Sequence, residues 1–212
     1  MKGARTACIL AGSFLLGSML GLSQAAPDPW LILASGEKSA INAHTTRADL
    51  VRMYGAANVV DEEADVGEGD METVTTVFPR DPKRSIDILW KDPDKKTAPD
   101  SLTIRGCASR WKTEHNISLG MSLKRLEGLN GKPFHLSGLG WDYAGTVLSW
   151  ADGILAPDLS GAQGHVILRL TCSGNPVTKE EGSAVAPDGD FSSQNAIMQK
   201  INPTVGEIKW VF

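Results

Sequence analysis

The sequence is poor in several residue types and motifs, and each shortage excludes a class of protein. Its 212 residues include three cysteines, four histidines and only 6% aromatic residues. The histidines are widely spaced and no H-x-x-x-H, H-x-H or C-x-x-C pair occurs, so the sequence indicates no metal site. It also has no P-loop, no dinucleotide fingerprint and no G-x-S-x-G nucleophile elbow. We therefore expect no cofactor, and no motif identifies an enzyme.

Long apolar runs are missing too, except at the N-terminus. Lys2 and Arg5 precede an acid-free apolar stretch, residues 7–22, which is followed by Ser23-Gln24-Ala25. A charged start, a short apolar core and a small-x-small site are typical of a cleaved signal peptide. A retained membrane anchor is the alternative, but this stretch is short and rich in glycine and serine. We therefore expect residues 1–25 to be removed on export, leaving a chain without stable membrane insertion.

Basic residues are also fewer than acidic ones. The leader carries two of the 21 basic residues and none of the 25 acidic ones, which leaves 19 basic against 25 acidic residues, a net charge of −6. The basic residues are scattered singly along the chain. We therefore expect no nucleic-acid binding and no adhesion to an anionic membrane by charge alone.

Two cysteines remain after the leader, which contains Cys8. Cys107 and Cys172 each follow a predicted strand, at residues 102–105 and 166–171. In an oxidising compartment, two cysteines indicate one disulfide, and two unpaired thiols are the alternative.

The most informative pattern is a segment that occurs twice. Residues 41–55, INAHTTRADLVRMYG, match residues 117–131, ISLGMSLKRLEGLNG, at a constant offset of 76 residues. Each copy has a candidate N-cap, Thr46 or Ser122, then an apolar stripe at helical spacing and a terminal glycine. Each copy therefore predicts a short helix, and the repeat indicates one supersecondary unit used twice.

Strand-like sequence follows each predicted helix. We expect a first unit at residues 26–112 and a second at residues 113–212, which form one cooperative domain. The expected class is α+β, with the two helix-then-antiparallel-strand units sharing one sheet and the helices on one face. Residues 61–72, which hold seven acids, are expected to be a solvated loop. Residues 173–194 are expected to be a long surface loop.

The best candidate for a functional site is residues 134–150, FHLSGLGWDYAGTVLSW, where aromatics alternate with glycines. Trp141 and Tyr143, with Asp142 between them, could form a platform for a ligand or partner, since glycines permit close backbone approach. The alternative is a bent strand whose aromatics fill the core, the commoner situation. His135 is a further candidate contact residue, and a hydrogen-bonded structural role is its alternative. The other tryptophans are expected mostly in the core: Trp30, Trp90, Trp111, Trp150 and Trp210.

The same region carries a resemblance to a known family. L-N-G-x-P-F at residues 129–134, G-W-D-Y-x-G at residues 140–145 and S-W at residues 149–150 resemble a family of uncharacterised exported proteins of Gram-negative bacteria. The resemblance covers most of the mature chain and implies a periplasmic location without an activity. More distantly, the G-M-S-plus-helix unit is similar to small outer-membrane assembly lipoproteins and tandem-repeat β-lactamase-inhibitory proteins, which bind other proteins. The chain lacks the lipobox cysteine of the first group and an inhibitory loop that matches the second.

The sequence therefore predicts a periplasmic, non-catalytic protein that binds an envelope protein or a small ligand through residues 141–143. It does not indicate an oligomeric state. A pocket with two convergent titratable groups would favour catalysis, and an exposed aromatic ridge would favour binding.

Two alternatives stay open. The first is a hydrolase of cell-wall glycan or peptide, in which Asp142 acts as acid or base with Glu127, Asp152 or His135. The second is an inhibitor of a secreted enzyme, for which residues 173–194 are the candidate loop.

Overall fold

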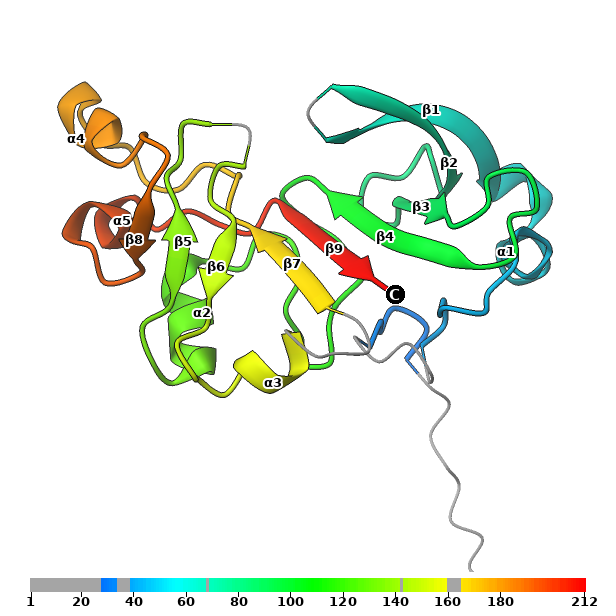
Figure 1. Cartoon of the computed structure of the whole chain (residues 1–212), viewed down its shortest axis with the longest axis horizontal. Coiled ribbons are helices and arrows are strands. Elements are labelled where there is room, and N and C mark those ends of the chain that lie inside the picture. Colours follow the sequence, from blue (N-terminus) through cyan, green and yellow to red (C-terminus); the bar gives the residue numbers. More distant parts are fainter. Residues whose placement is uncertain (1–27, 34–38, 68, 142, 160–164) are drawn as a thin grey trace, which may run out of the picture.

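The computed structural model describes residues 28–33, 39–67, 69–141, 143–159 and 165–212 (Figure 1). The expected leader lies outside these residues. Two antiparallel sheets and several short helices make up the fold, which confirms the α+β class. Within the described ranges, no helix is long and apolar enough to cross a membrane.

The larger sheet has six strands and draws on both units of the sequence. Its strands, in their order across the sheet, are β1 (Val59–Gly67), β2 (Asp70–Val77), β3 (Ile86–Trp90), β4 (Pro99–Arg105), β9 (Glu207–Val211) and β7 (His165–Arg169). β9 pairs with β4 on one side and with β7 on the other. The two units therefore share one dominant sheet, as expected.

The second unit also builds a smaller sheet that the sequence did not predict. Its strands, in order, are β6 (Val147–Ser149), β5 (His135–Ser137) and β8 (Asp190–Ser192). The two sheets meet at a bridge between Thr146 and Arg169, where Leu170 N–H also donates to the Gly145 carbonyl at 2.9 Å. The helices are α1 (Arg47–Tyr54), α2 (Leu123–Asn130), α3 (Ala156–Leu159), α4 (Lys179–Ala184) and α5 (Ala196–Ile201), with a 3₁₀ turn, η1 (Ala56–Asn58).

The two predicted helices form at the predicted positions. α1 and α2 begin and end 76 residues apart. Thr46 caps α1 in a capping box with Asp49, and the Ser122 hydroxyl caps α2 by accepting a backbone N–H. Gly55 and Gly131 are the C-cap residues. The strands that follow differ, because β1 to β4 form a meander and the second unit divides its strands between two sheets.

The acidic stretch is a hairpin rather than the expected loop. β1 pairs with β2 from Val59 opposite Val77 to Asp65 opposite Met71. β1 is an edge strand, and charged side chains on an edge discourage pairing with another chain. The composition predicted a loop because aspartate and glutamate have low strand propensity, which the pairing with β2 overrides.

Residues 173–194 are more regular than expected. They contain all of α4 and β8. Thr178 and Glu181 form a capping box at the start of α4, and Lys200 Nζ lies 2.7 Å from Glu181 Oε1. The expected long surface loop is therefore interrupted by α4 and β8, and capping and an ion pair to α5 hold this segment.

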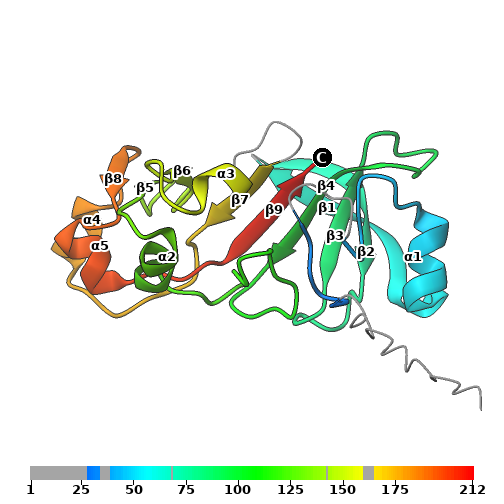
Figure 2. The ribbon, with the colours of Figure 1, turned by 90° about the horizontal axis from the view of Figure 1, so that it is seen from below.

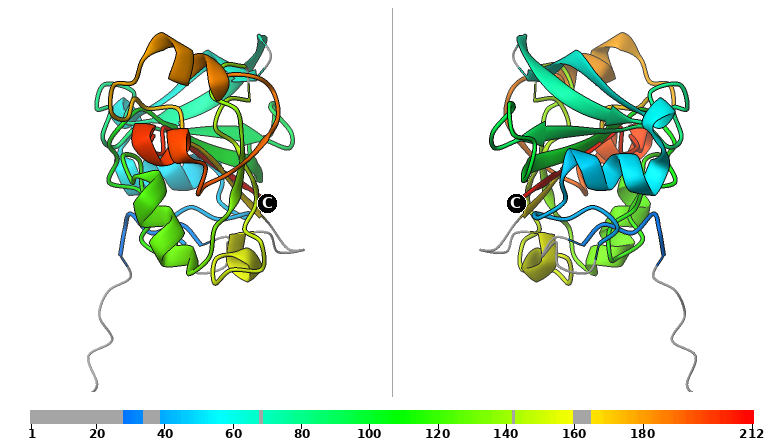
Figure 3. Two further views of the ribbon diagram at one scale, coloured as in Figure 1. Left: turned by 90° about the vertical axis from the view of Figure 1, so that its left-hand side faces the viewer. Right: turned by 90° about the vertical axis from the view of Figure 1, so that its right-hand side faces the viewer.

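The core lies on one face of the larger sheet. Alternate residues of the central strands point into it, including Ile88, Ile104, Ile208 and Trp210. α1 adds Leu50 to this core and packs against the sheet (Figure 2). Figure 3 shows α1 and α2 on one side of the sheet and the far end of the β1–β2 hairpin on the other. The second face of the sheet therefore carries the outward-pointing, mostly polar residues.

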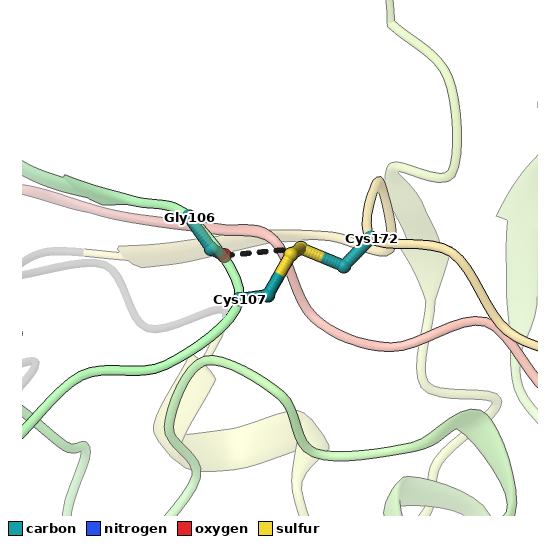
Figure 4. Close-up of a disulfide and its surroundings, with 3 residues drawn as sticks. All are labelled: Gly106, Cys107 and Cys172. Atoms are coloured by element: carbon teal, nitrogen blue, oxygen red, sulfur yellow. Dashed lines mark hydrogen bonds between the residues drawn. A yellow bond between two sulfur atoms is a disulfide. The ribbon is translucent and has the colours of Figure 1, made fainter.

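One disulfide cross-links the fold. Cys107 follows β4 and Cys172 follows β7, and the structure joins them with a Cα–Cα distance of 5.8 Å (Figure 4). Cys172 Sγ also lies 3.2 Å from the carbonyl oxygen of Gly106. Because β9 runs between β4 and β7, the bridge ties together the ends of the two strands that flank it.

Candidate functional site

Trp141 and Tyr143 lie at the surface, in the loop that joins β5 to β6. Their exposed fractions are 62% and 56%, whereas Trp90, Trp111 and Trp210 are 4% exposed or less. The interpretation that these two aromatics fill the core is therefore wrong. Asp142 lies outside the described residues.

Other aromatics of the same segment behave as core residues. Phe134 and Trp150 are buried and their ring centroids lie 5.2 Å apart. They flank the β5–β6 hairpin at its base, so the core interpretation of this segment holds for these two residues and not for Trp141 and Tyr143. Sequence alone could not divide them, because the division depends on which side of the hairpin meets the core.

Backbone hydrogen bonds hold the β5–β6 loop against the connection between α4 and β8. Leu139 N–H donates to the Val185 carbonyl at 2.8 Å, and Gly140 N–H donates to the Ala186 carbonyl at 3.1 Å. The first half of the loop therefore has a fixed path.

The second half of the loop is closed by the Tyr143 carbonyl, which accepts three hydrogen bonds. The donors are the Ser137 hydroxyl at 2.6 Å, the Thr146 hydroxyl at 2.8 Å and Thr146 N–H at 3.1 Å. Ala144 N–H also donates to the Trp141 carbonyl at 2.7 Å. The backbone carbonyls of both exposed aromatics are therefore bonded within the loop.

Two glycines make this packing possible. A Cβ on Gly138 would lie 1.9 Å from the Pro187 carbonyl oxygen, and one on Gly145, whose φ is +66°, would lie 2.5 Å from the Leu170 carbonyl oxygen. The sequence predicted close backbone approach at these glycines. The backbone that lies close to each glycine belongs to this protein and not to a ligand. The glycines therefore allow the loop to pack against its neighbouring segments.

His135 starts β5, at the opposite end of that strand from the aromatic loop. Its Nδ1 lies 2.7 Å from Asp190 Oδ1 on β8, and both side chains are substantially exposed. The structure thus gives His135 a cross-strand partner, which matches the hydrogen-bonded structural role. An exposed pair of this kind contributes little to stability.

The acids considered for hydrolysis lie on separate elements. Glu127 on α2 accepts a hydrogen bond from the Ser193 hydroxyl, which itself accepts Phe134 N–H at 3.0 Å. Asp152 lies in the turn before α3, with a φ of +55°. Among the residues that the structure describes, no group of three or more His, Cys, Asp or Glu could hold a metal ion.

A second polar feature, which the sequence reasoning missed, lies on the outward face of the larger sheet. Asp87 accepts hydrogen bonds from the Thr76 hydroxyl at 2.9 Å and from Arg105 Nη1 at 3.0 Å. Arg105 Nε also pairs with Glu207 at 3.0 Å. The alternation of polar and apolar residues in β3 and β4 is the signal that could have located this face.

Asp87 is the most perturbed carboxyl of this face. Burial raises its pKa, and hydrogen bonding by Thr76 and the charge of Arg105 oppose the rise, while the charge of Glu62 adds to it. A cavity of about 10 Å³, room for about one water molecule, adjoins Asp87, Ser101 and Thr103. A cavity of this volume is too small for a substrate. The polar contacts of Asp87 and Arg105 therefore serve to hold neighbouring strands of the sheet together.

Comparison with protein-family models, with curated proteins and with solved structures finds no match to this chain. The class of this protein is therefore described from its fold and its candidate site alone. It is an α+β protein with one dominant antiparallel sheet, one disulfide and a pair of exposed aromatics on a well-held loop.

Proposed function

We propose that this chain is an exported, non-catalytic binding protein of the periplasm, and that the β5–β6 loop is its contact surface. The observation that carries the proposal is the exposure of Trp141 and Tyr143, at 62% and 56%, on a loop whose backbone is hydrogen-bonded on both sides. Large aromatics are enriched among the residues that dominate protein interfaces. They offer apolar area together with a polar atom at one end.

The hydrogen bonds of the described part of the loop strengthen the argument. Ordering a flexible loop on binding costs free energy, and a loop that is already held avoids much of that cost. The hydrogen bonds of the Tyr143 carbonyl and the contacts of Gly138 and Gly145 provide this order before any partner arrives. Two exposed aromatic side chains of this kind suit contact with an envelope protein better than with a small ligand, which prefers a concave site.

Export is supported by two further observations. The disulfide between Cys107 and Cys172 is typical of an oxidising compartment. The N-terminal sequence has the pattern of a cleaved leader.

The experiment is a pull-down from periplasmic extract with the mature chain, residues 26–212, read by mass spectrometry. We expect one dominant envelope protein, and we expect Trp141→Ala with Tyr143→Ala to lose it. The matched control is Met71→Ala with Ile154→Ala, which removes two side chains that are 57% and 66% exposed elsewhere.

Retention of every partner by the folded Trp141→Ala, Tyr143→Ala variant would show that the contact surface lies elsewhere. If the wild-type chain captures nothing, a screen of glycan and peptide substrates tests the hydrolase alternative directly.

A further inference from the structure

The turn between β2 and β3 gathers positive charge on a chain whose net charge is negative. Arg80, Lys83 and Arg84 belong to this turn, and Arg110 lies beside it because its N–H donates to the Lys83 carbonyl at 2.8 Å. Arg80 and Arg84 line a surface hollow of about 300 Å³. The other residues that line it are Asn58, Phe78, Pro79, Asp81 and Pro82.

The single acid of this hollow is already neutralised. Asp81 Oδ2 lies 2.6 Å from Arg84 Nε, and Asp81 Oδ1 accepts Lys83 N–H at 3.0 Å. The hydrogen bond from Arg84 is the main cause that holds the pKa of Asp81 below its usual value. Among the described residues, the side chains of Arg80 and Lys83 have no acidic partner, while the pKa of Asp28 is lowered by its hydrogen bond with Lys112 and also by the charge of Arg110. Two positive charges therefore remain uncompensated at this turn, and only one of them, on Arg80, lines the hollow.

Two arginine side chains of this surface lie over aromatic rings. The Arg110 guanidinium lies 4.5 Å from the centroid of the Trp30 ring, and that of Arg84 lies 4.3 Å from the Phe78 centroid. The Trp30 and Phe78 centroids are 6.3 Å apart. Arginine and aromatic side chains thus alternate across this surface, and cation–π contacts orient the guanidinium groups.

The backbone of the turn is unusual at Phe78. Its φ is +57°, a left-handed conformation that is rare for a bulky residue. Asp81 N–H donates to the Phe78 carbonyl at 3.0 Å, and the Tyr54 ring packs against Phe78 with centroids 5.3 Å apart. A strained residue held in this way is common in clamps that bind ligands. The strain places Phe78 under Arg84, so it contributes directly to the shape of the hollow.

We propose that this turn is a binding site for a ligand that bears phosphate groups. Guanidinium groups match the oxygens of phosphate in geometry and charge. Two uncompensated cations, with Arg84 and Arg110 beside them, favour a group with more than one negative charge, and the volume of the hollow lies at the small end of the range for ligand sites. The site is separate from the β5–β6 loop and does not depend on the function proposed for it.

The test uses the mature chain and inorganic pyrophosphate at constant ionic strength, with amide chemical shifts recorded by NMR during titration. We expect saturable shifts centred on residues 79–84 and on Arg110. Arg80→Gln with Lys83→Gln should weaken the affinity by about tenfold or more. The matched control, Lys124→Gln with Arg125→Gln, removes two exposed charges from α2 and should leave the affinity unchanged.

Three results would overturn the proposal. The first is the absence of saturable shifts in the wild-type chain. The second is an equal loss of affinity in the α2 control, which would mean that only net charge matters. The third is tighter binding of a tetraglutamate peptide than of pyrophosphate, which would assign the hollow to carboxylates. Circular dichroism of all variants checks that these exposed substitutions leave the fold intact.

Discussion

Asp87 and Arg105 face each other across β3 and β4, with Asp87 Oδ2 3.0 Å from Arg105 Nη1. The same guanidinium reaches Glu207 on β9 at 3.0 Å and donates to the Asp65 carbonyl on β1 at 3.3 Å. Arg105 therefore connects three strands to its own. Since β1 lies at the far edge of the sheet, this side chain also holds the end of the β1–β2 hairpin over the sheet face.

We expect Arg105→Gln to destabilise the protein by about 1 to 2 kcal/mol. The substitution leaves the partly buried carboxylate of Asp87 without its cationic partner, which is costlier than losing an exposed ion pair. Chemical denaturation measures the change. Arg52→Gln, which breaks a more exposed pair with Asp49, is the control and should cost less than about 0.5 kcal/mol. Equal effects of the two substitutions would contradict the role of Arg105.

Two aspartates should affect stability with opposite signs as the pH changes. Burial alone would raise the pKa of Asp61, but hydrogen bonds from Lys96, Thr75 and Arg47 outweigh it and lower the pKa to about 2. A carboxyl whose pKa is lower in the folded state stabilises the fold above its unfolded pKa, and this stability is lost as the pH falls. Asp61 should therefore contribute to loss of stability between about pH 4 and pH 2.

The pKa of Asp87 is raised in the folded state, so the pH dependence of its contribution to stability has the opposite sign to that of Asp61. The folded state takes up its proton more readily than the unfolded state, and its contribution to stability declines as the pH rises through the folded pKa.

Denaturation at several pH values separates the two carboxyls. Asp61→Asn should flatten the fall of stability below pH 4, and Asp87→Asn should steepen the fall at acid pH because the opposing carboxyl is removed. Glu72→Gln on the same hairpin is the control. A pH profile of Asp61→Asn parallel to that of the wild type would show that the ion pairs of Asp61 do not persist in solution.

Breaking the disulfide should lower stability by about 2 to 4 kcal/mol, since it closes a long loop in the unfolded chain. Cys107→Ser, Cys172→Ser and the double variant should have similar denaturation midpoints, all below that of the oxidised wild type. Reduction of the wild type should lower its midpoint to a similar degree. An unchanged midpoint after reduction would mean that the bridge does not form in solution.

Asn130 should be the most sensitive polar residue of α2. It is fully buried, and its side-chain amide donates to the carbonyls of Lys132 and Trp150 at 3.0 and 2.9 Å. Its side-chain oxygen accepts Leu155 N–H at 3.3 Å. Asn130→Ala would leave these backbone groups unpaired and should cost about 2 kcal/mol or more.

Thermal and chemical unfolding measure this loss. Ser122→Ala, at the other end of the same helix, should cost only about 1 kcal/mol as the removal of one cap. A larger effect at Ser122 than at Asn130 would contradict this ranking.

Local sequence predicted the helices well because their signals are local. Thr46 and Ser122 bond to amides within the next turn, and a glycine ends each helix, so all the information lies within ten residues or so. The pairing of Cys107 with Cys172 could be predicted for a simpler reason, since they are the only two cysteines in the sequence after residue 25.

The candidate site was predicted only as a region. Residues 134–150 were singled out as one segment, yet Phe134 and Trp150 are buried while Trp141 and Tyr143 are exposed. The contacts of Arg105 were missed because its ion-pair partners, Asp87 and Glu207, come from β3 and β9, which meet β4 only through strand pairing. The acidic stretch was misassigned for the same reason, since the partner strand rather than composition makes it a hairpin.

The sequence by itself determined the α+β class, the two capped helices, the bridging cysteines and the loop that carries the aromatics. Those features depend on spacing, on capping and on residues close together in the chain. Only the tertiary structure decided the split into two sheets, which aromatics face solvent, and which charges meet across the strands. These outcomes depend on contacts between residues far apart in sequence, where burial and pairing outweigh local preference.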